Sequence, residues 1–152
     1  MKNSSFSRFY RVLCTFSAFL AVISVLCVPS HAVPGTDDAE MLSRMAEAVA
    51  PGKPFSVRVA VCAVMLNRVS SPGFPDTLPA VTAGMVSSLR ERGADYTAIV
   101  PDARSRRAAA TALRGGDPTR GSVYFAESEN VPPDIRESGR IRFEGGGFAF
   151  WR

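Results

Sequence analysis

The stretch 55–69 constrains the fold more than any other part of the chain, because it has no continuous polar face before Asn67 and Arg68. Alternating valines near its start would also suit a strand, but the run is longer than most strands, so we predict a buried helix. A helix that is apolar nearly all round has to be enclosed by other elements. The rest of the chain therefore has to supply the layer that wraps it.

Three further helices are predicted around this central one. Leu42, Met45 and Val49 recur at spacings of three and four residues, which is the buried stripe of an amphipathic helix. An aspartate that caps its start and a Pro-Gly pair at its end mark the limits of that helix. The helices that such signals predict span residues 37–50, 80–92 and 103–114.

The last part of the chain has a different pattern. Residues 122–126 read as a strand, and 127–139 are polar and interrupted by prolines, so we expect a loop there. Residues 141–144 and 148–151 flank three glycines, which predicts a terminal hairpin with a three-residue turn. Helices come first and strands last, which is typical of an α+β domain.

Residues 1–32 are expected to form a secretory signal peptide. Basic residues precede an apolar run at 12–28, and Ser30 and Ala32 are the small residues that signal peptidase reads. We therefore predict cleavage after Ala32 and export of one domain, residues 33–152. The alternative is an uncleaved membrane anchor, for which the apolar run is at the short end of the required length.

The net charge of +4 does not identify a partner. Three of the 18 basic residues, Lys2, Arg8 and Arg11, belong to the predicted signal peptide, and without them the net charge is only +1. A nearly neutral domain lacks the excess of positive charge that binding to nucleic acid or an anionic membrane requires. We expect no nucleic-acid partner, and membrane contact only through an uncleaved signal segment.

The residue types that remain after cleavage exclude several kinds of site. The only histidine, His31, and two of the three cysteines belong to the predicted signal peptide. A Ser/His/Asp triad, a Cys/His dyad or a histidine-based zinc site is therefore excluded. Cys62 stands alone in an apolar run and is expected to be a core residue without a disulfide. Carboxylates, hydroxyls, amides and arginines remain for chemistry, and we expect no metal or cofactor.

Glu47 is the best candidate for a catalytic group. It points away from the stripe that contains Leu42 and Met45, because a helix turns about 100° per residue. On one interpretation it is a solvated glutamate that pairs with Arg44, three residues earlier. On the other, later elements cover this second face and form a groove in which a partly buried carboxyl can donate a proton. The spacing does not decide between them.

Several short motifs follow one another from about Met41 to the C-terminus. They are Ala46-Glu47-Ala48, the run from Arg58 to Val69, Ser71-Pro72-Gly73-Phe74-Pro75-Asp76-Thr77, Arg106-Arg107-Ala108-Ala109, Gly116-Asp117-Pro118-Thr119, Tyr124-Phe125 and Gly146-Gly147. In this order they resemble the SleB-type cell-wall hydrolase family, the spore cortex-lytic enzymes. The central run and the turn after it are the most specific part, because a generic buried helix does not need that polar ending.

The resemblance implies a lysozyme-like helical core and cleavage of peptidoglycan glycan strands, in the manner of a lytic transglycosylase or muramidase, during remodelling of the cell wall or spore cortex. The family's catalytic acid is the glutamate of the Ala-Glu-Ala motif, which is Glu47 here. One carboxylate can protonate the glycosidic oxygen and then act as base while the sugar's own 6-hydroxyl closes a 1,6-anhydro ring. This chemistry needs no metal and no histidine.

The chain departs from the family pattern just after this glutamate. The family has a short Arg-Gly-Glu-Pro-Tyr-like stretch there, whereas residues 49–55 form a longer segment that lacks the second glutamate. Two hypotheses therefore stand: an enzyme that cleaves peptidoglycan glycan strands, and a non-catalytic cell-wall-binding or spore-associated structural module that retains the fold.

Tyr124, Asn67 and Glu127 are the candidates for substrate contact. An aromatic ring suits a sugar face, but a strand tyrosine such as Tyr124 more often packs half-buried. Asn67 lies where a helix-end cap is the simpler explanation. Glu127 follows a predicted strand, where it is either a second carboxylate of the groove, in reserve to Glu47, or a solubilising surface acid.

Overall fold

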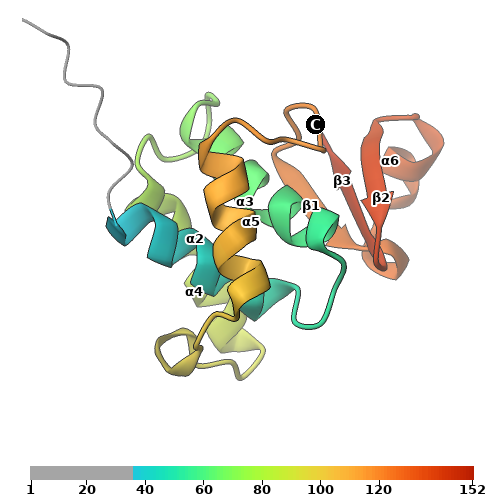
Figure 1. Ribbon diagram of the computed structural model, residues 1–152. Coiled ribbons are helices and arrows are strands. Elements are labelled where there is room, and N and C mark those ends of the chain that lie inside the picture. The colour runs from blue at the N-terminus through green and yellow to red at the C-terminus, as the bar shows by residue number, and fades with distance from the viewer. Residues whose placement is uncertain (1–35) are drawn as a thin grey trace, which may run out of the picture. The chain divides into compact units, whose positions relative to one another are not determined.

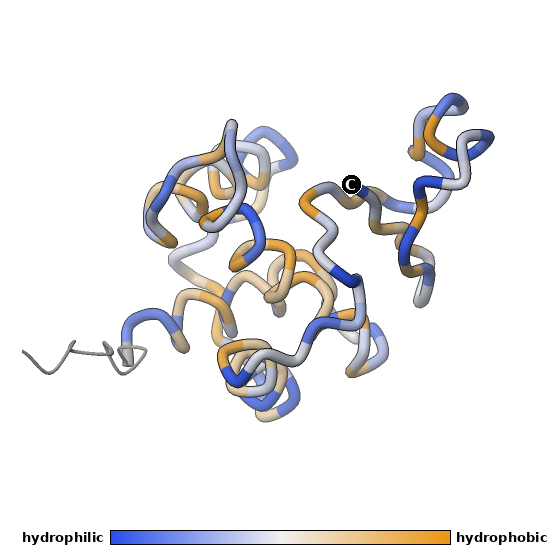
Figure 2. The backbone as a smooth tube through the Cα atoms, turned by 90° about the horizontal axis from the view of Figure 1, so that it is seen from above, coloured by the Kyte–Doolittle hydropathy of each residue, from blue (hydrophilic) through white to orange (hydrophobic). Residues whose placement is uncertain are grey.

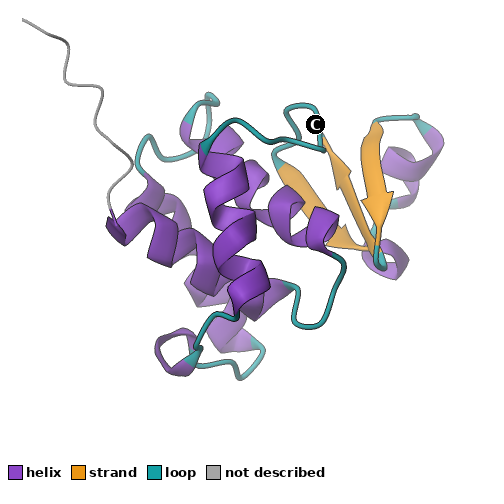
Figure 3. Ribbon diagram, in the orientation of Figure 1, coloured by secondary structure: helices purple, strands orange, loops and turns teal. Residues whose placement is uncertain are grey.

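The computed structural model describes residues 36–152, so the predicted signal peptide and its cleavage site at Ala32 lie outside the described residues. Within this part of the chain the long helices come first and the strands last, which confirms the predicted α+β class (Figure 1, Figure 3). The long helices are α2 (Thr36–Val49), α3 (Phe55–Val69), α4 (Leu78–Glu91) and α5 (Ala103–Leu113). The strands are β1 (Tyr124–Glu127), β2 (Ile141–Gly145) and β3 (Phe148–Trp151), and a short helix, α6 (Pro133–Glu137), precedes β2.

The helix ends lie within two residues of their predicted positions. The two aspartates expected to cap α2 lie inside its first turn instead, since the helix begins at Thr36. Negative side chains there still face the positive end of the helix dipole. α4 begins two residues earlier than expected, because Pro79 occupies its first turn, where proline is well tolerated. None of the helices within residues 36–152 is both long and apolar enough to cross a membrane.

α3 is enclosed by other elements, as predicted. Every residue from Val57 to Met65 is buried, and the helix contacts α2, α4, α5 and β1. Burial of each valine or methionine contributes about 1.5–3 kcal/mol relative to exposure, which fixes this helix at the centre of the fold. Figure 2 shows hydrophobic and hydrophilic residues alternating along the helical turns. One residue within the buried stretch, Arg58, is charged.

The three strands form an antiparallel sheet in the order β1-β3-β2. All four side chains of the central strand β3 are buried. Because successive side chains of a strand point to opposite faces, Phe148 and Phe150 join the helical core, whereas Ala149 and Trp151 join a second small core. This second core also contains Ile135 of α6. The sheet therefore lies between the long helices and α6, as Figure 1 shows.

The prediction of a loop at 127–139 is wrong. A 3₁₀ turn, η3 (Ser128–Asn130), and α6 occupy this segment. Val131 and Ile135 are buried against the sheet, and these two apolar anchors are enough to order a segment whose other residues are mostly polar. The expected loop between α4 and α5 likewise contains a 3₁₀ turn, η2 (Tyr96–Ala98).

The predicted hairpin exists, but its turn has two residues instead of three. β2 continues through Gly145, which pairs with Phe148, so only Gly146 and Gly147 connect the strands. Both have positive φ, 57° and 84°, as the tight turns that suit twisted strands require. A Cβ on Gly146 would lie 2.9 Å from Pro54 Cδ, so this glycine also permits close contact between the hairpin and the segment before α3.

Candidate active site

Glu47 lies in the last turn of α2, on the face that is covered by later parts of the chain. Only 20% of its side chain is exposed, and its Oε2 accepts a hydrogen bond of 2.8 Å from Arg58 Nη1. The predicted pairing with Arg44 is wrong, because Arg44 instead binds Glu40 at 2.9 Å. The packing of α5 on α2 and α3 covers this face of α2, so Glu47 is sheltered and pairs with Arg58.

Arg58 organises this site from the buried part of α3. Its side chain is only 2% exposed, so its donors need partners within the protein. Nη1 donates to Glu47 Oε2, to Asp102 Oδ1 at 2.7 Å and to Ser105 Oγ at 2.6 Å, and Nε donates to the Lys53 carbonyl at 3.3 Å. The guanidinium therefore connects α2, α3 and the start of α5.

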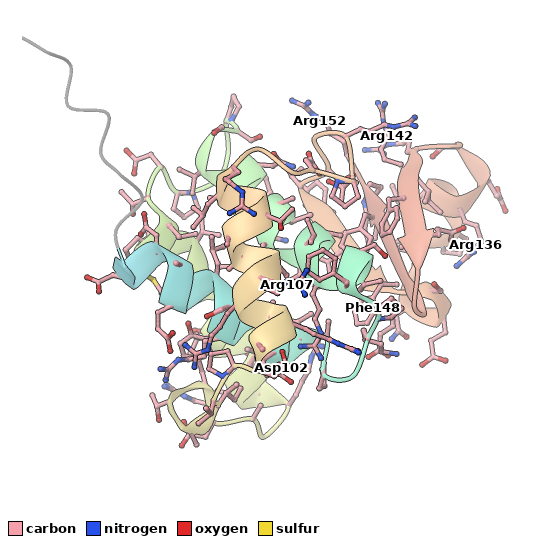
Figure 4. The ribbon with its side chains drawn as sticks, in the orientation of Figure 1. Asp102, Arg107, Arg136, Arg142, Phe148 and Arg152 are labelled. Atoms are coloured by element: carbon pink, nitrogen blue, oxygen red, sulfur yellow. The ribbon has the colours of Figure 1, made fainter. Side chains whose placement is uncertain are left out.

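Asp102 is the N-cap of α5, at the end of that helix marked in Figure 4. Its Oδ1 accepts a hydrogen bond of 2.7 Å from the backbone N–H of Ser105. This bond lowers the pKa of Asp102 below its usual value against the opposing effect of burial, and the nearby charge of Arg58 lowers it further. Asp102 is therefore ionised at neutral pH.

The two carboxylate oxygens of Glu47 have different surroundings. Oε2 accepts from Arg58 Nη1, from Ser105 Oγ at 2.9 Å and from the Asp102 N–H at 3.3 Å. Oε1 accepts no hydrogen bond from the described residues. One oxygen is thus anchored and the other is left to carry a proton or meet a ligand. Glu47 and Asp102 thus share the guanidinium of Arg58.

Asn67 and Tyr124 lie toward the other end of α3. Nine residues separate Arg58 from Asn67, about 14 Å along the helix axis. Asn67 Nδ2 donates to Asp117 Oδ2 at 3.1 Å and to the Ser122 carbonyl at 3.0 Å, so it ties α3 to the segment that leads into β1. Tyr124 is 43% exposed and stacks on Trp151 with ring centroids 6.0 Å apart.

Glu127 lies at the opposite end of β1 from Tyr124, toward the Glu47 end of the domain. It pairs with Phe148 across the sheet, and Lys53 Nζ lies 5.6 Å from the centroid of the Phe148 ring. Lys53 is also the residue whose carbonyl holds Arg58. Of the three candidates for substrate contact, only Glu127 is thus linked to the Glu47 cluster, through Phe148 and Lys53.

A hollow of about 370 Å³ opens beside Glu127, and we call it the sheet-side hollow. The residues that line it come from the end of α4, from β1 and η3, and from the start of β3, and they are Arg92, Phe125, Ala126, Glu127, Asn130 and Phe148. Figure 4 marks Phe148 at this end of the sheet. The hollow combines two aromatic side chains with the polar groups of Arg92, Glu127 and Asn130.

Cys62 does not contribute to this site. It is buried without a disulfide, as predicted, and burial raises the pKa of its thiol to about 12. Such a thiol is not a nucleophile at neutral pH. Among residues 36–152 no group of three or more His, Cys, Asp or Glu side chains could hold a metal ion.

Sequence reasoning missed Arg58, Asp102, Ser105 and Lys53 as parts of the site. A signal for Arg58 was available, since a charge within an otherwise apolar helix needs a buried partner. Asp102 was recognisable only as the start of a helix. Nothing in the sequence shows that this helix start meets the end of α2.

Comparison with known proteins identifies the family to which the chain is similar. A family model described as Cell Wall Hydrolase matches residues 52–144, a range that begins just after Glu47. A spore cortex-lytic enzyme of Halalkalibacterium halodurans is 35% identical over 106 residues, which cover 69% of this chain and 30% of that protein. One from Oceanobacillus iheyensis is 31% identical over 123 residues, which cover 74% of this chain and 40% of that protein. The chain thus spans less than half the length of these curated relatives.

Two solved structures share the fold. The catalytic domain of the Bacillus cereus SleB protein superposes with a TM-score of 0.67 at 24% identity, covering 78% of this chain and 91% of that domain. The catalytic domain of the germination-specific lytic transglycosylase SleB from Bacillus anthracis gives a TM-score of 0.64 at 25% identity, covering 82% of this chain and all of that domain. The predicted lysozyme-like helical core with a small antiparallel sheet is therefore confirmed.

Proposed function

The chain belongs to the cell wall hydrolase family, as its motifs predicted, and we propose that it cleaves the glycan strands of bacterial peptidoglycan with Glu47 as the general acid and base. The names of its relatives, spore cortex-lytic enzyme and lytic transglycosylase, support this class of substrate. The observation that carries the proposal is the anchoring of Glu47, in which Oε2 accepts from Arg58, Ser105 and the backbone of Asp102 while Oε1 is left available.

In the first step, the proton on Glu47 Oε1 passes to the glycosidic oxygen as the bond from that oxygen to C1 of the muramyl sugar breaks. The three hydrogen bonds to Oε2 hold the carboxyl in one orientation, which lowers the entropic cost of reaching the reactive geometry. Asp102 keeps its negative charge on Arg58, so the guanidinium remains neutralised while Glu47 is protonated.

In the second step, Glu47 is a carboxylate and takes the proton from the 6-hydroxyl of the same sugar while the oxygen of that hydroxyl bonds to C1. The product is a 1,6-anhydro muramyl end, and Glu47 regains the proton it gave in the first step. Attack from within the substrate requires no second carboxylate as nucleophile, which agrees with a site in which Asp102 is occupied by Arg58 and the Ser105 N–H.

Two residues at the two ends of β1, Glu127 and Tyr124, are assigned contacts to the glycan strand. In this proposal Glu127, which lines the sheet-side hollow, accepts hydrogen bonds from a sugar near the cleaved bond. Tyr124 presents an exposed ring to a more distant sugar. Asn67 acts indirectly, since its amide nitrogen already binds Asp117 and the Ser122 carbonyl. Export through a cleaved signal peptide, residues 1–32, completes the proposal, because the substrate lies outside the cytoplasmic membrane.

Mass analysis of fragments released from purified peptidoglycan tests the proposal. We expect wild-type protein to release fragments with 1,6-anhydro muramyl ends, Glu47→Gln to release none, and the control Glu137→Gln, on the exposed side of α6, to match wild type. Fragments with reducing muramyl ends would instead assign hydrolysis by water. Sedimentation with the wall and no soluble fragments would contradict the proposal in favour of a non-catalytic binding module.

A further inference from the structure

Two positively charged side chains lie in or beside the sheet-side hollow, although the neutral ring of a sugar offers no charge to pair with them. Arg92 lines the hollow, and Lys53 Nζ lies over the ring of Phe148, one of its walls. Neither cation forms an ion pair within the described part of the chain. Glu127 is the one acidic lining residue, and its contact with Asn130 Nδ2 is long, at 3.5 Å. The three charged side chains therefore leave a net charge of +1.

The walls of the hollow suit a compact organic group. Phe125 and Phe148 stand on neighbouring strands with ring centroids 6.3 Å apart and a tilt of 52° between them. The two rings offer apolar contact to a ligand, while Arg92, Glu127 and Asn130 can orient it by hydrogen bonds. The volume of about 370 Å³ falls at the small end of the usual range for ligand sites.

Lys53 connects this hollow to the catalytic cluster. Its side chain reaches over Phe148, while its backbone carbonyl accepts from Arg58 Nε at 3.3 Å. Arg58 in turn holds Glu47. One residue, Lys53, therefore links the hollow to the cluster that holds Glu47.

The chemistry of peptidoglycan limits what this substituent can be. The rings of its two sugars are neutral, and negative charge enters through the lactyl group of the muramyl sugar, either as its own carboxylate or through the peptide attached to it. Guanidinium and ammonium groups recognise carboxylates by charge-assisted hydrogen bonds. On the basis of the proposed function, we propose that the sheet-side hollow, with Arg92 and Lys53, binds the carboxylate-bearing lactyl substituent of a muramyl residue next to the cleaved bond.

Binding measurements on full-length Glu47→Gln protein test this subsite without turnover, since glutamine keeps the acceptor for Ser105 and the Asp102 N–H. The probes are three tetrasaccharides of alternating N-acetylglucosamine and N-acetylmuramic acid. One has free lactyl carboxylates, one has intact peptide stems, and one has its lactyl carboxylates converted to methylamides. We expect the methylamide form to bind at least about fivefold more weakly than the best charged form, with a difference that shrinks as salt is added.

Variants assign the effect to the two cations. In Lys53→Gln/Arg92→Gln protein the charged and methylamide probes should bind equally, whereas the control Arg90→Gln, on the same helix but outside the hollow, should keep the preference. Tighter binding of the stem-bearing probe identifies the peptide carboxylates as the ligand, and tighter binding of the stem-free probe identifies the lactyl carboxylate.

The proposal would be overturned by any of three results: equal binding of all three probes by Glu47→Gln protein, tighter binding of the methylamide probe, or a preference for charged probes that survives in the double variant. A preference without glycan cleavage by wild-type protein would refute only the catalytic proposal.

Discussion

Arg58 Nη1 lies 2.8 Å from Glu47 Oε2 and 2.7 Å from Asp102 Oδ1, so one buried nitrogen joins the end of α2 to the start of α5. The most central helix of the fold therefore also sets the position of the proposed catalytic carboxyl. A change in the packing of α3 should be transmitted directly to Glu47.

Replacement of Arg58 by lysine should impair both catalysis and stability. A single ammonium cannot reproduce the planar set of donors that reaches Glu47, Asp102 and the Lys53 carbonyl. We expect the rate of glycan cleavage to fall by about a hundredfold, as for a misplaced catalytic group, and the free energy of unfolding to fall by about 1–3 kcal/mol. Rates on purified peptidoglycan and urea denaturation measure the two effects. The exposed control Arg104→Lys should change neither, and an Arg58→Lys protein that retains the wild-type rate would contradict the positioning role.

Replacement of Asp102 by asparagine should remove a pH dependence of stability in the acidic range. The hydrogen bond from the Ser105 N–H and the nearby charge of Arg58 lower the pKa of Asp102 in the folded protein. The ionised carboxylate therefore stabilises the fold above its unfolded pKa, and this contribution is lost as the pH falls through the folded pKa. Asparagine can still cap α5 but does not titrate. Urea denaturation of wild type, Asp102→Asn and the exposed control Asp134→Asn from neutral to acidic pH measures the effect. An acidic loss of stability as large in Asp102→Asn as in wild type would contradict it.

Asp117 should make stability depend on pH in the acidic range. Burial acts to raise its pKa, but hydrogen bonds from Thr119, Asn67 and the Gly121 N–H outweigh burial and lower it. Because the folded pKa lies below the unfolded value, the stabilisation is fully present above the unfolded value and is lost as the pH falls through the folded one. We expect Asp117→Ala to lower the free energy of unfolding by about 1–3 kcal/mol at pH 7.

Chemical denaturation of wild type and Asp117→Ala between pH 7 and about pH 3 checks this expectation. The difference between the two proteins should be constant near neutrality and shrink below about pH 4. A difference that stays the same across the whole range would mean that the ionised carboxylate does not carry the effect.

Gly146 should be more sensitive to substitution than other glycines with positive φ. Alanine there would be strained at a φ of 57°, and its Cβ would also lie 2.9 Å from Pro54 Cδ and 3.0 Å from Val57 Cγ2. The control Gly139→Ala has a similar φ of 65° but meets no atom within 4 Å. We expect a loss of about 1 kcal/mol for Gly139→Ala from strain alone and about 2–3 kcal/mol for Gly146→Ala. Equal losses in thermal or urea unfolding would contradict the predicted contact.

The sequence predicted the fold well where one periodic pattern covered a whole element. The stretch 55–69 is apolar nearly all round and longer than most strands, which favours a buried helix, and the stripe of Leu42, Met45 and Val49 defines α2. Prediction failed at 127–139, where Val131 and Ile135 are too few to produce a periodic signal yet anchor η3 and α6 against the sheet. It failed by one residue at the hairpin, because strand pairing extends through Gly145.

The candidate site was predictable in part. The Ala-Glu-Ala motif identified Glu47, but the partners of Glu47 come from Arg58, Asp102 and Ser105, which lie 11 to 58 residues away in sequence. A local sequence pattern cannot reveal contacts between residues so far apart in the chain. The sequence likewise placed Asn67 and Glu127 in one group of substrate contacts, although Asn67 binds the segment before β1 and Glu127 lies at the far end of that strand.

The most direct test of the central claim is the rate of glycan cleavage by Glu47→Gln protein compared with wild type, measured on the same peptidoglycan and with thermal unfolding as a check on folding. Loss of a general acid should lower the rate by at least about a hundredfold, while binding of glycan tetrasaccharides is retained. A folded Glu47→Gln protein that releases anhydro-muramyl fragments at the wild-type rate would contradict the assignment of Glu47 as the catalytic acid.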